Sequence, residues 1–197
     1  MAAPGHTSSV SLPSALFTFS QGCIRPYHPS DAPALAVHAN NHNISRWMTN
    51  RFPHPYGLED AEEWINVCIN SSPMCNYAIT DAKNSVIGGI GLAPNSPLEV
   101  HALAMEIGYW LGEDRWGRGI ASEVLAMFTD WAFRVARQDL QRLAAAVFEG
   151  NVASGRVLLK AGYVFEGVHR KAGFKEGKVL DERVYAMTRD DWQKLRG

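Results

Sequence analysis

The stretch that decides the fold runs from Met105 to Ala121, MEIGYWLGEDRWGRGIA. Its first seven residues predict a buried strand, and after the polar link GEDR come Gly117 and Gly119, directly before a predicted helix. The first turn of a helix leaves backbone N–H groups unpaired and carries the positive end of the helix dipole. Glycines let another group approach such a backbone closely, so the pattern indicates a cradle for a pyrophosphate.

Length and composition predict one domain over residues 16–197, behind a tail over residues 1–15 that is expected to be disordered. The formal net charge of −1 argues against nucleic acid or a membrane surface as a partner. No apolar run approaches the roughly 20 residues that a membrane span needs. The cysteines, Cys23, Cys68 and Cys75, lack metal-site spacing, which predicts a reducing, cytoplasmic compartment, no disulfides and no metal.

Hydrophobic periodicity predicts strands and helices in an order that suits an α/β sandwich with a mixed, mostly antiparallel sheet. Ser30 is expected to cap the first helix and Gly162 to end the last one. The apolar run 143–148 is expected to be buried on both faces and to pair in parallel with 105–111. Strands are predicted over 16–27, 77–80, 86–92, 105–111, 143–148, 163–170 and 179–187, and helices over 30–40, 59–69, 120–135 and 152–161.

A second segment, NVASGRVLLKAGYVFEG over 151–167, completes the pattern that the glycine turn begins. Together the two segments resemble motifs A and B of the GNAT superfamily of N-acetyltransferases that use acetyl-coenzyme A (acetyl-CoA). The stretches 24–35, 43–65 and 177–192 fit its RimJ/RimL-like branch, so the resemblance covers about residues 17–193. It implies a GNAT-like fold with a splayed central parallel strand pair, and direct attack by the amine of a protein N-terminus or a small molecule.

The resemblance assigns the glycine turn and the strand before it to the binding of acetyl-CoA. Backbone N–H groups of the turn would meet the pyrophosphate, and the free strand edge would meet the pantetheine amides and polarise the thioester carbonyl. A bulge at Gly108 is expected to splay the strand, and Trp116 stands where the family usually has Gln or Arg. The expected cofactor-binding residues are Tyr109, Leu111, Trp116, Gly117, Arg118, Gly119, Ile120, Ala121, Ser122 and Asn151.

Two catalytic residues are expected, Glu106 and Ser154. Glu106 matches an acid proposed as a base acting through water; its alternative is a structural carboxylate, in an ion pair or on an exposed face. In the resemblance Ser154 faces the sulfur and Asn151 binds pantetheine, while helix capping is the alternative for both. Many GNAT enzymes place a Tyr where Leu158 stands, so the acid for the leaving thiolate falls to Ser154, to water or to no group.

The acceptor is expected beside an aromatic, proline-stiffened loop, for which a simple core lid is the alternative. A basic cluster over 169–178 is interpreted as a solvated hairpin and not as a nucleic-acid site, with the 3′-phosphate of coenzyme A or an acidic peptide as alternative partners. A small-amine acetyltransferase and a catalytically weak acyl-CoA-binding or sensing protein stay open as functions, and a monomer or a homodimer as assemblies. The expected substrate-binding residues are Trp47, Met48, Phe52, Tyr56 and Trp110.

Overall fold

The computed structural model describes residues 12–95 and 99–197, so most of the predicted tail lies outside the described residues. The strands are β1 (Phe17–Phe19), β2 (Gly22–Arg25), β3 (Asn76–Asp81), β4 (Val86–Pro94), β5 (Ala104–Leu111), β6 (Arg142–Phe148), β7 (Val164–Lys175) and β8 (Lys178–Thr188). The α-helices are α1 (Ala32–Ala39), α2 (His42–Ser45), α3 (Leu58–Asn70), α4 (Ile120–Trp131), α5 (Val152–Lys160) and α6 (Arg189–Lys194). None of the described helices is long and apolar enough to cross a lipid bilayer.

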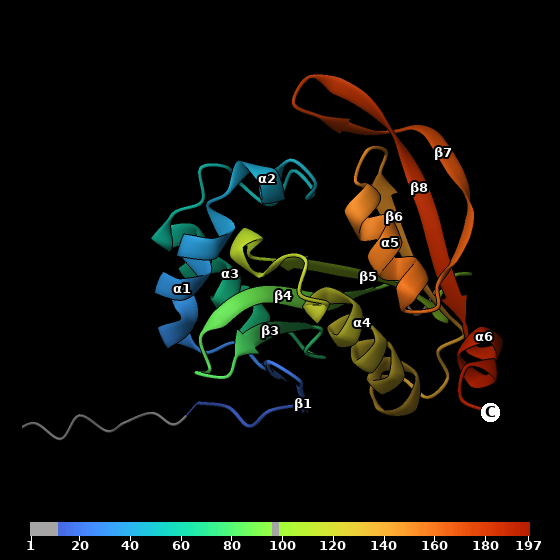
Figure 1. The fold of residues 1–197 in the computed structure, drawn as a ribbon, viewed down its shortest axis with the longest axis horizontal. Coiled ribbons are helices and arrows are strands. Elements are labelled where there is room, and N and C mark those ends of the chain that lie inside the picture. Colours follow the sequence, from blue (N-terminus) through green and yellow to red (C-terminus); the bar gives the residue numbers. More distant parts are fainter. Residues whose placement is uncertain (1–11, 96–98) are drawn as a thin grey trace, which may run out of the picture.

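The strands form one eight-stranded sheet in the order β1-β2-β3-β4-β5-β6-β8-β7. Among the strands of the described residues only β5 and β6 run parallel, while every other pair of neighbours is antiparallel, which confirms the predicted sheet. Helices α1 and α3 lie beside the β3–β4 half of the sheet, whereas α4 packs against β5 and α5, and α5 packs against β7 and β8 (Figure 1). Each pair of helices covers its own hydrophobic core, the main core under α4 and α5 and the second core under α1 and α3, so the two faces of the sheet are covered at different places.

The parallel pair separates early, as expected. Strands β5 and β6 pair only from Ala104 to Glu106, opposite Arg142 to Ala144. The expected bulge at Gly108 is wrong, because the ladder between β4 and β5 runs from Met105 to Leu111 without a shift in register. Instead, β5 stays with β4 while β6 pairs with β8 along its whole length, and the two halves of the sheet diverge.

Strand β6 was expected to be buried on both faces, and this is wrong. Leu143, Ala145 and Val147 are buried under α4 and α5, whereas Ala146 on the opposite face is exposed. The helices on that face cover β3 and β4 but not β6. The sheet therefore has an open face over β6, and this open face borders the candidate site.

Two local predictions near the N-terminus also fail. The predicted strand 16–27 is a hairpin of β1 and β2, whose turn is held by Ser20 donating from its backbone N–H to the Glu123 carboxylate of α4 (2.8 Å). Ser30 does not cap α1, because His28 Nδ1 accepts the Ser30 N–H (3.2 Å) and caps a 3₁₀ turn instead. At the other end of the chain Gly162, at φ +92°, follows α5 as predicted.

Candidate active site

A cleft of about 500 Å³ occupies the gap where β5 and β6 part. Its walls are the two diverging strands, the glycine turn with the start of α4, one side of α5 along its length, and α2 with the segment after it. Arg115, Arg156 and Lys160 line it, and no carboxylate is among its lining residues in the described chain. The cleft is therefore apolar at the strands and positively charged at its rim, which suits an elongated ligand with phosphate groups.

The glycine turn has the geometry of an anion site. Gly117 and Gly119 have φ values of +74° and +81°, a left-handed region that favours glycine. A Cβ atom added at either glycine would meet nothing within 4 Å, so the backbone is open to a ligand. The first intrahelical bond of α4 runs from Glu123 N–H to the Gly119 carbonyl (3.1 Å), which leaves the N–H groups of 120–122 for an anion.

Two predicted binding residues beside this turn bond groups outside it, although Trp116 also lines the cleft. The Trp116 indole N–H donates to the Leu111 carbonyl (2.7 Å), so it closes the loop between β5 and the turn. Arg118 does not line the cleft, and its carbonyl accepts a bond from Gln21 Nε2 (3.3 Å) on the β1–β2 turn. Backbone N–H groups are thus the donors that the turn itself offers to a phosphate.

The strand edges offer further main-chain groups to the cleft. The Gly112 N–H donates to the Ile87 carbonyl (2.8 Å), which fixes the alternation of the antiparallel β4–β5 ladder. By this alternation Tyr109 and Leu111 direct their main-chain groups toward β6, beyond the last paired residue. The bond from Glu149 N–H to the Asp181 carbonyl (2.9 Å) likewise shows which residues of β6 bond β8. By the same alternation, the main-chain groups of Ala146 point away from β8 and into the gap.

At the start of α5, Asn151 caps the helix, whereas Ser154 faces the cleft. Asn151 is the N-cap, because its Oδ1 accepts the Ser154 N–H at 3.2 Å. Ser154 is not a cap; its Oγ lies 3.0 Å from the Tyr109 hydroxyl, on the cleft side of the helix. Burial raises the pKa of Tyr109 to about 12. Leu158, at the position of the missing acid, is fully buried in the main core.

Glu106 lies on the open face of the sheet, opposite the buried side chains of Met105 and Ile107. It occupies the last paired position of β5, opposite Ala144, where the gap begins. The described part of the chain places no hydrogen-bond or ion-pair partner on its carboxylate, so the arrangement is that of an exposed face and not of an ion pair. Its carboxylate is free to accept a proton from a group that approaches across this face.

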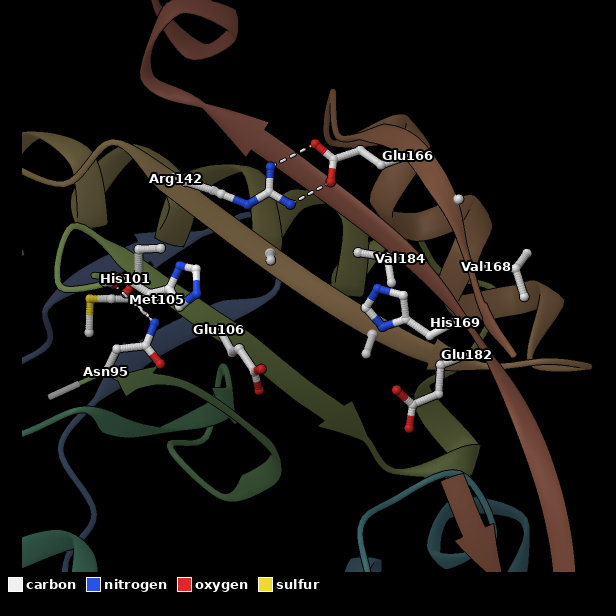
Figure 2. Close-up of a pocket in the computed structure, with 14 residues that line it drawn as sticks. Asn95, His101, Met105, Glu106, Arg142, Glu166, Val168, His169, Glu182 and Val184 are labelled. Atoms are coloured by element: carbon white, nitrogen blue, oxygen red, sulfur yellow. Dashed lines mark hydrogen bonds and ion pairs between the residues drawn. The ribbon is translucent and has the colours of Figure 1, made fainter. Parts of the chain in front are cut away.

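Glu106 lines a second cavity, of about 730 Å³, over β5, β6, β7 and β8. Figure 2 shows Glu106, His169 and Glu182 around this cavity, with the ion pair between Arg142 and Glu166 at its far side. Ala146 lines both cavities, so the cleft and the second cavity border each other at this residue, beyond the last paired position of β5 and β6.

One part of the aromatic loop lines the cleft, as expected of a pocket wall, and the other part packs in a core, as expected of a core lid. Trp47 and Met48 line the cleft, together with Trp110 of β5. Phe52 and Tyr56 do not line it; their rings lie 5.0 Å apart and belong to the second core, beneath α1 and α3. Tyr56 is buried there because α3 covers it.

The β7–β8 hairpin borders the second cavity and not the cleft, a placement that its sequence does not specify. The hairpin curves over toward α2 (Figure 1), where Asn50 Nδ2 donates to the Phe174 carbonyl (3.2 Å). Its basic residues do not line the cleft, whereas Arg156 and Lys160 do. Their spacing of four residues on the helix after Asn151 is the sequence signal that could have identified them.

Residues 23–164 match the family model of the acetyltransferase (GNAT) domain. The chain is similar to the uncharacterized N-acetyltransferase YoaA of Bacillus subtilis, with 31% identity over 84% of this chain and 92% of that protein. It is 25% identical to the [ribosomal protein uS5]-alanine N-acetyltransferase of Escherichia coli, over 95% of this chain and 97% of that protein. Mycobacterium smegmatis RimJ in complex with CoA-disulfide shares the fold, with a TM-score of 0.74 and 22% identity over 86% of this chain and 82% of that one. The chain therefore belongs to the GNAT family and is an acetyl-CoA-dependent N-acetyltransferase.

Proposed function

We propose that the protein transfers the acetyl group of acetyl-CoA directly to the α-amino group of a protein N-terminus. The observation that carries this proposal is that Ala146 lines both the cleft and the second cavity, the one that Glu106 borders on the open face. None of the cysteines lines either cavity, and burial raises the pKa of Cys68 to about 12, so an acyl-enzyme on sulfur has no support.

The cleft fits the parts of acetyl-CoA in order. The N–H groups of 120–122 would hold the pyrophosphate, and the main-chain groups of Ala146 and the N–H of Leu111, whose carbonyl already accepts the Trp116 indole N–H, would hold the pantetheine amides. The N–H of Tyr109, which lies further along β5 and beside Ser154, would polarise the thioester carbonyl.

The acceptor amine would approach across the open face, past Glu106. An α-amino group has a pKa of about 8 and a lysine side chain about 10.4, so roughly a tenth of the former is neutral at pH 7 and far less of the latter. An exposed carboxylate that acts through water is a sufficient base for an α-amino group. The similarity to a ribosomal-protein N-terminal acetyltransferase supports the same acceptor class.

A panel of acceptors tests this proposal, with the free thiol of coenzyme A as the readout. Peptides with free N-termini are expected to release thiol faster than polyamines or other small amines, and N-terminally blocked peptides are expected to release none. Turnover with small amines and with none of the peptides would contradict the proposed acceptor and make the protein a small-amine acetyltransferase. Tight binding of acetyl-CoA without turnover on any amine would instead favour an acyl-CoA-binding or sensing protein.

Charge at the cleft rim gives a second prediction. Arg156→Gln and Lys160→Gln should each weaken the binding of coenzyme A by about 1.5- to 5-fold, since exposed ion pairs contribute roughly 0.2–1 kcal/mol. Isothermal calorimetry with coenzyme A and with 3′-dephospho-coenzyme A measures the effect and assigns it to a phosphate. The matched control is Arg170→Gln with Lys171→Gln on the hairpin, which should bind like wild type. If this control binds coenzyme A more weakly than wild type, a phosphate of coenzyme A contacts the hairpin.

Ser154→Ala gives a third prediction. Because a hydrogen bond to a charged group contributes roughly 1.5–3 kcal/mol, loss of the bond to the leaving thiolate should lower kcat by about 10- to 100-fold. Affinity for acetyl-CoA and thermal stability should stay near wild type, because Asn151 and not Ser154 caps α5. Asn151→Ala is the contrasting variant, expected to lose about 0.5–2 kcal/mol of stability. A kcat of Ser154→Ala equal to that of wild type would show that Ser154 has no catalytic role.

A further inference from the structure

We infer that Tyr109 is a positioning residue, whose hydroxyl donates to Ser154 Oγ and thereby directs the serine O–H toward the thioester sulfur. This inference rests on the proposed function of the cleft. Leu158 stands where an acid was expected, and the pair of Tyr109 and Ser154 would stabilise the leaving thiolate in its place. Tyr109 itself touches neither substrate through its hydroxyl and acts only through Ser154.

The contacts of the Tyr109 hydroxyl are short and local. Its oxygen lies 3.0 Å from Ser154 Oγ and 3.2 Å from the Ser154 carbonyl oxygen. That carbonyl accepts the i→i+4 bond of the helix and, through its second lone pair, a bond from the Tyr109 hydroxyl, while either oxygen can donate in the contact with Oγ. In the inferred arrangement, the tyrosine proton is therefore shared between the carbonyl oxygen and Oγ. A phenol is a more acidic donor than an aliphatic hydroxyl, and a proton given to Oγ leaves the serine proton free for the cleft.

The surroundings hold this pair in place. Tyr109 extends from β5 onto the covered face of the sheet and packs against the main core, beneath the first turn of α5. Since burial raises the pKa of Tyr109 to about 12, its hydroxyl keeps its proton over the range in which the amine attacks. The donor is thus present at every working pH.

A second tyrosine provides a natural comparison at the same turn of α5. The Tyr185 hydroxyl of β8 lies 2.6 Å from the place that a Cβ of Gly155 would occupy, and it accepts the Arg183 Nε–H at 3.3 Å. Both hydroxyls therefore contact the first turn of α5, but only that of Tyr109 bonds Ser154. Tyr185→Phe is the matched control for Tyr109→Phe.

The electron and proton balance of the step gives the pair a defined task. The amine nitrogen forms the new bond to the acetyl carbon, the carbon–sulfur bond breaks, and its electron pair goes to sulfur. The amine proton leaves through water to the Glu106 carboxylate. A thiol has a pKa of about 8.5, so the departing thiolate needs a hydrogen bond and not a full proton transfer from Ser154. Tyr109 polarises the serine hydroxyl and strengthens that bond.

The test measures the pKa of the thiol of bound coenzyme A, from its thiolate absorbance after subtraction of the same titration without ligand. A hydrogen bond to the thiolate lowers this pKa, so Ser154→Ala and Tyr109→Phe should each raise it, by roughly one unit and by a smaller step respectively. Ser154→Thr, which keeps a hydroxyl, should stay close to wild type, and so should Tyr185→Phe. This measurement needs no acceptor, so it stands even if the proposed acetyl transfer fails.

Kinetics provide the second half of the test. Tyr109→Phe should lower kcat and leave KM for acetyl-CoA unchanged, and the double variant with Ser154→Ala should be no slower than Ser154→Ala alone. A bound-thiol pKa in Tyr109→Phe equal to that of wild type overturns the inference. So does a double variant whose two losses multiply, because Tyr109 would then act independently of Ser154.

Discussion

Glu106→Gln is expected to lower kcat by about 10²–10⁴-fold, the range typical of a removed general base, with little change in the affinity for acetyl-CoA. The amide keeps the size of the side chain but cannot accept the proton of the attacking amine. The carboxylate lies on the open face, at the residue where β5 and β6 stop pairing, and no described residue pairs with it. Its loss should therefore leave the melting temperature unchanged.

The pH profile sharpens this prediction. Above the acceptor's pKa of about 8 the amine is neutral before it binds, so the defect of Glu106→Gln should shrink as the pH rises. Glu182→Gln is the matched control, because Glu182 borders the same cavity from β8, on the far side of β6. A rate loss shared by both variants would indicate a general effect of the cavity's charge. Full activity in Glu106→Gln, or a fall in its stability, would make Glu106 structural.

Much of the fold follows from patterns that are local in the sequence. The glycine turn, the long helix after it and the end of α5 at Gly162 depend on backbone conformations and periodicities that a few residues specify. The parallel pair follows from two apolar strands joined by that helix. The turn and the helix ends agree with the structure because each is decided within a single segment, and the parallel pair agrees because it is decided within one strand–helix–strand unit.

Other features depend on which segments meet, and the sequence does not specify this. The run 143–148 has the composition of a doubly buried strand, yet its open face results from where α1 and α3 pack. Aromatic residues suit a core and a pocket equally, so Trp47 and Phe52 could not be separated before the loop was placed. The contact between Tyr109 and Ser154 joins residues 45 positions apart and has no signature in either motif alone.

Gly119→Val is expected to weaken the binding of coenzyme A by roughly 10²–10⁴-fold, as the loss of two hydrogen bonds to charged phosphate would do at roughly 1.5–3 kcal/mol each. The added side chain would occupy the open space above the first turn of α4, where the phosphates are expected to approach. Gly119→Glu should be weaker still, because it also places a negative charge at the site. Calorimetric titration with coenzyme A measures both losses.

The backbone cost must be separated from the loss of the phosphate site, and Gly177 allows this. Gly177, in the β7–β8 turn, has φ +75° and nothing within 4 Å of an added Cβ, so it matches Gly119 in conformation and in free space. Both valine variants should lose a similar stability, about 1–2 kcal/mol for a left-handed residue, but only Gly119→Val should lose affinity. Equal affinity in the two folded variants would contradict the assignment of the glycine turn to the phosphates. Loss of affinity at Gly119 alone would mean that its open backbone, and not the stability of the fold, holds the ligand.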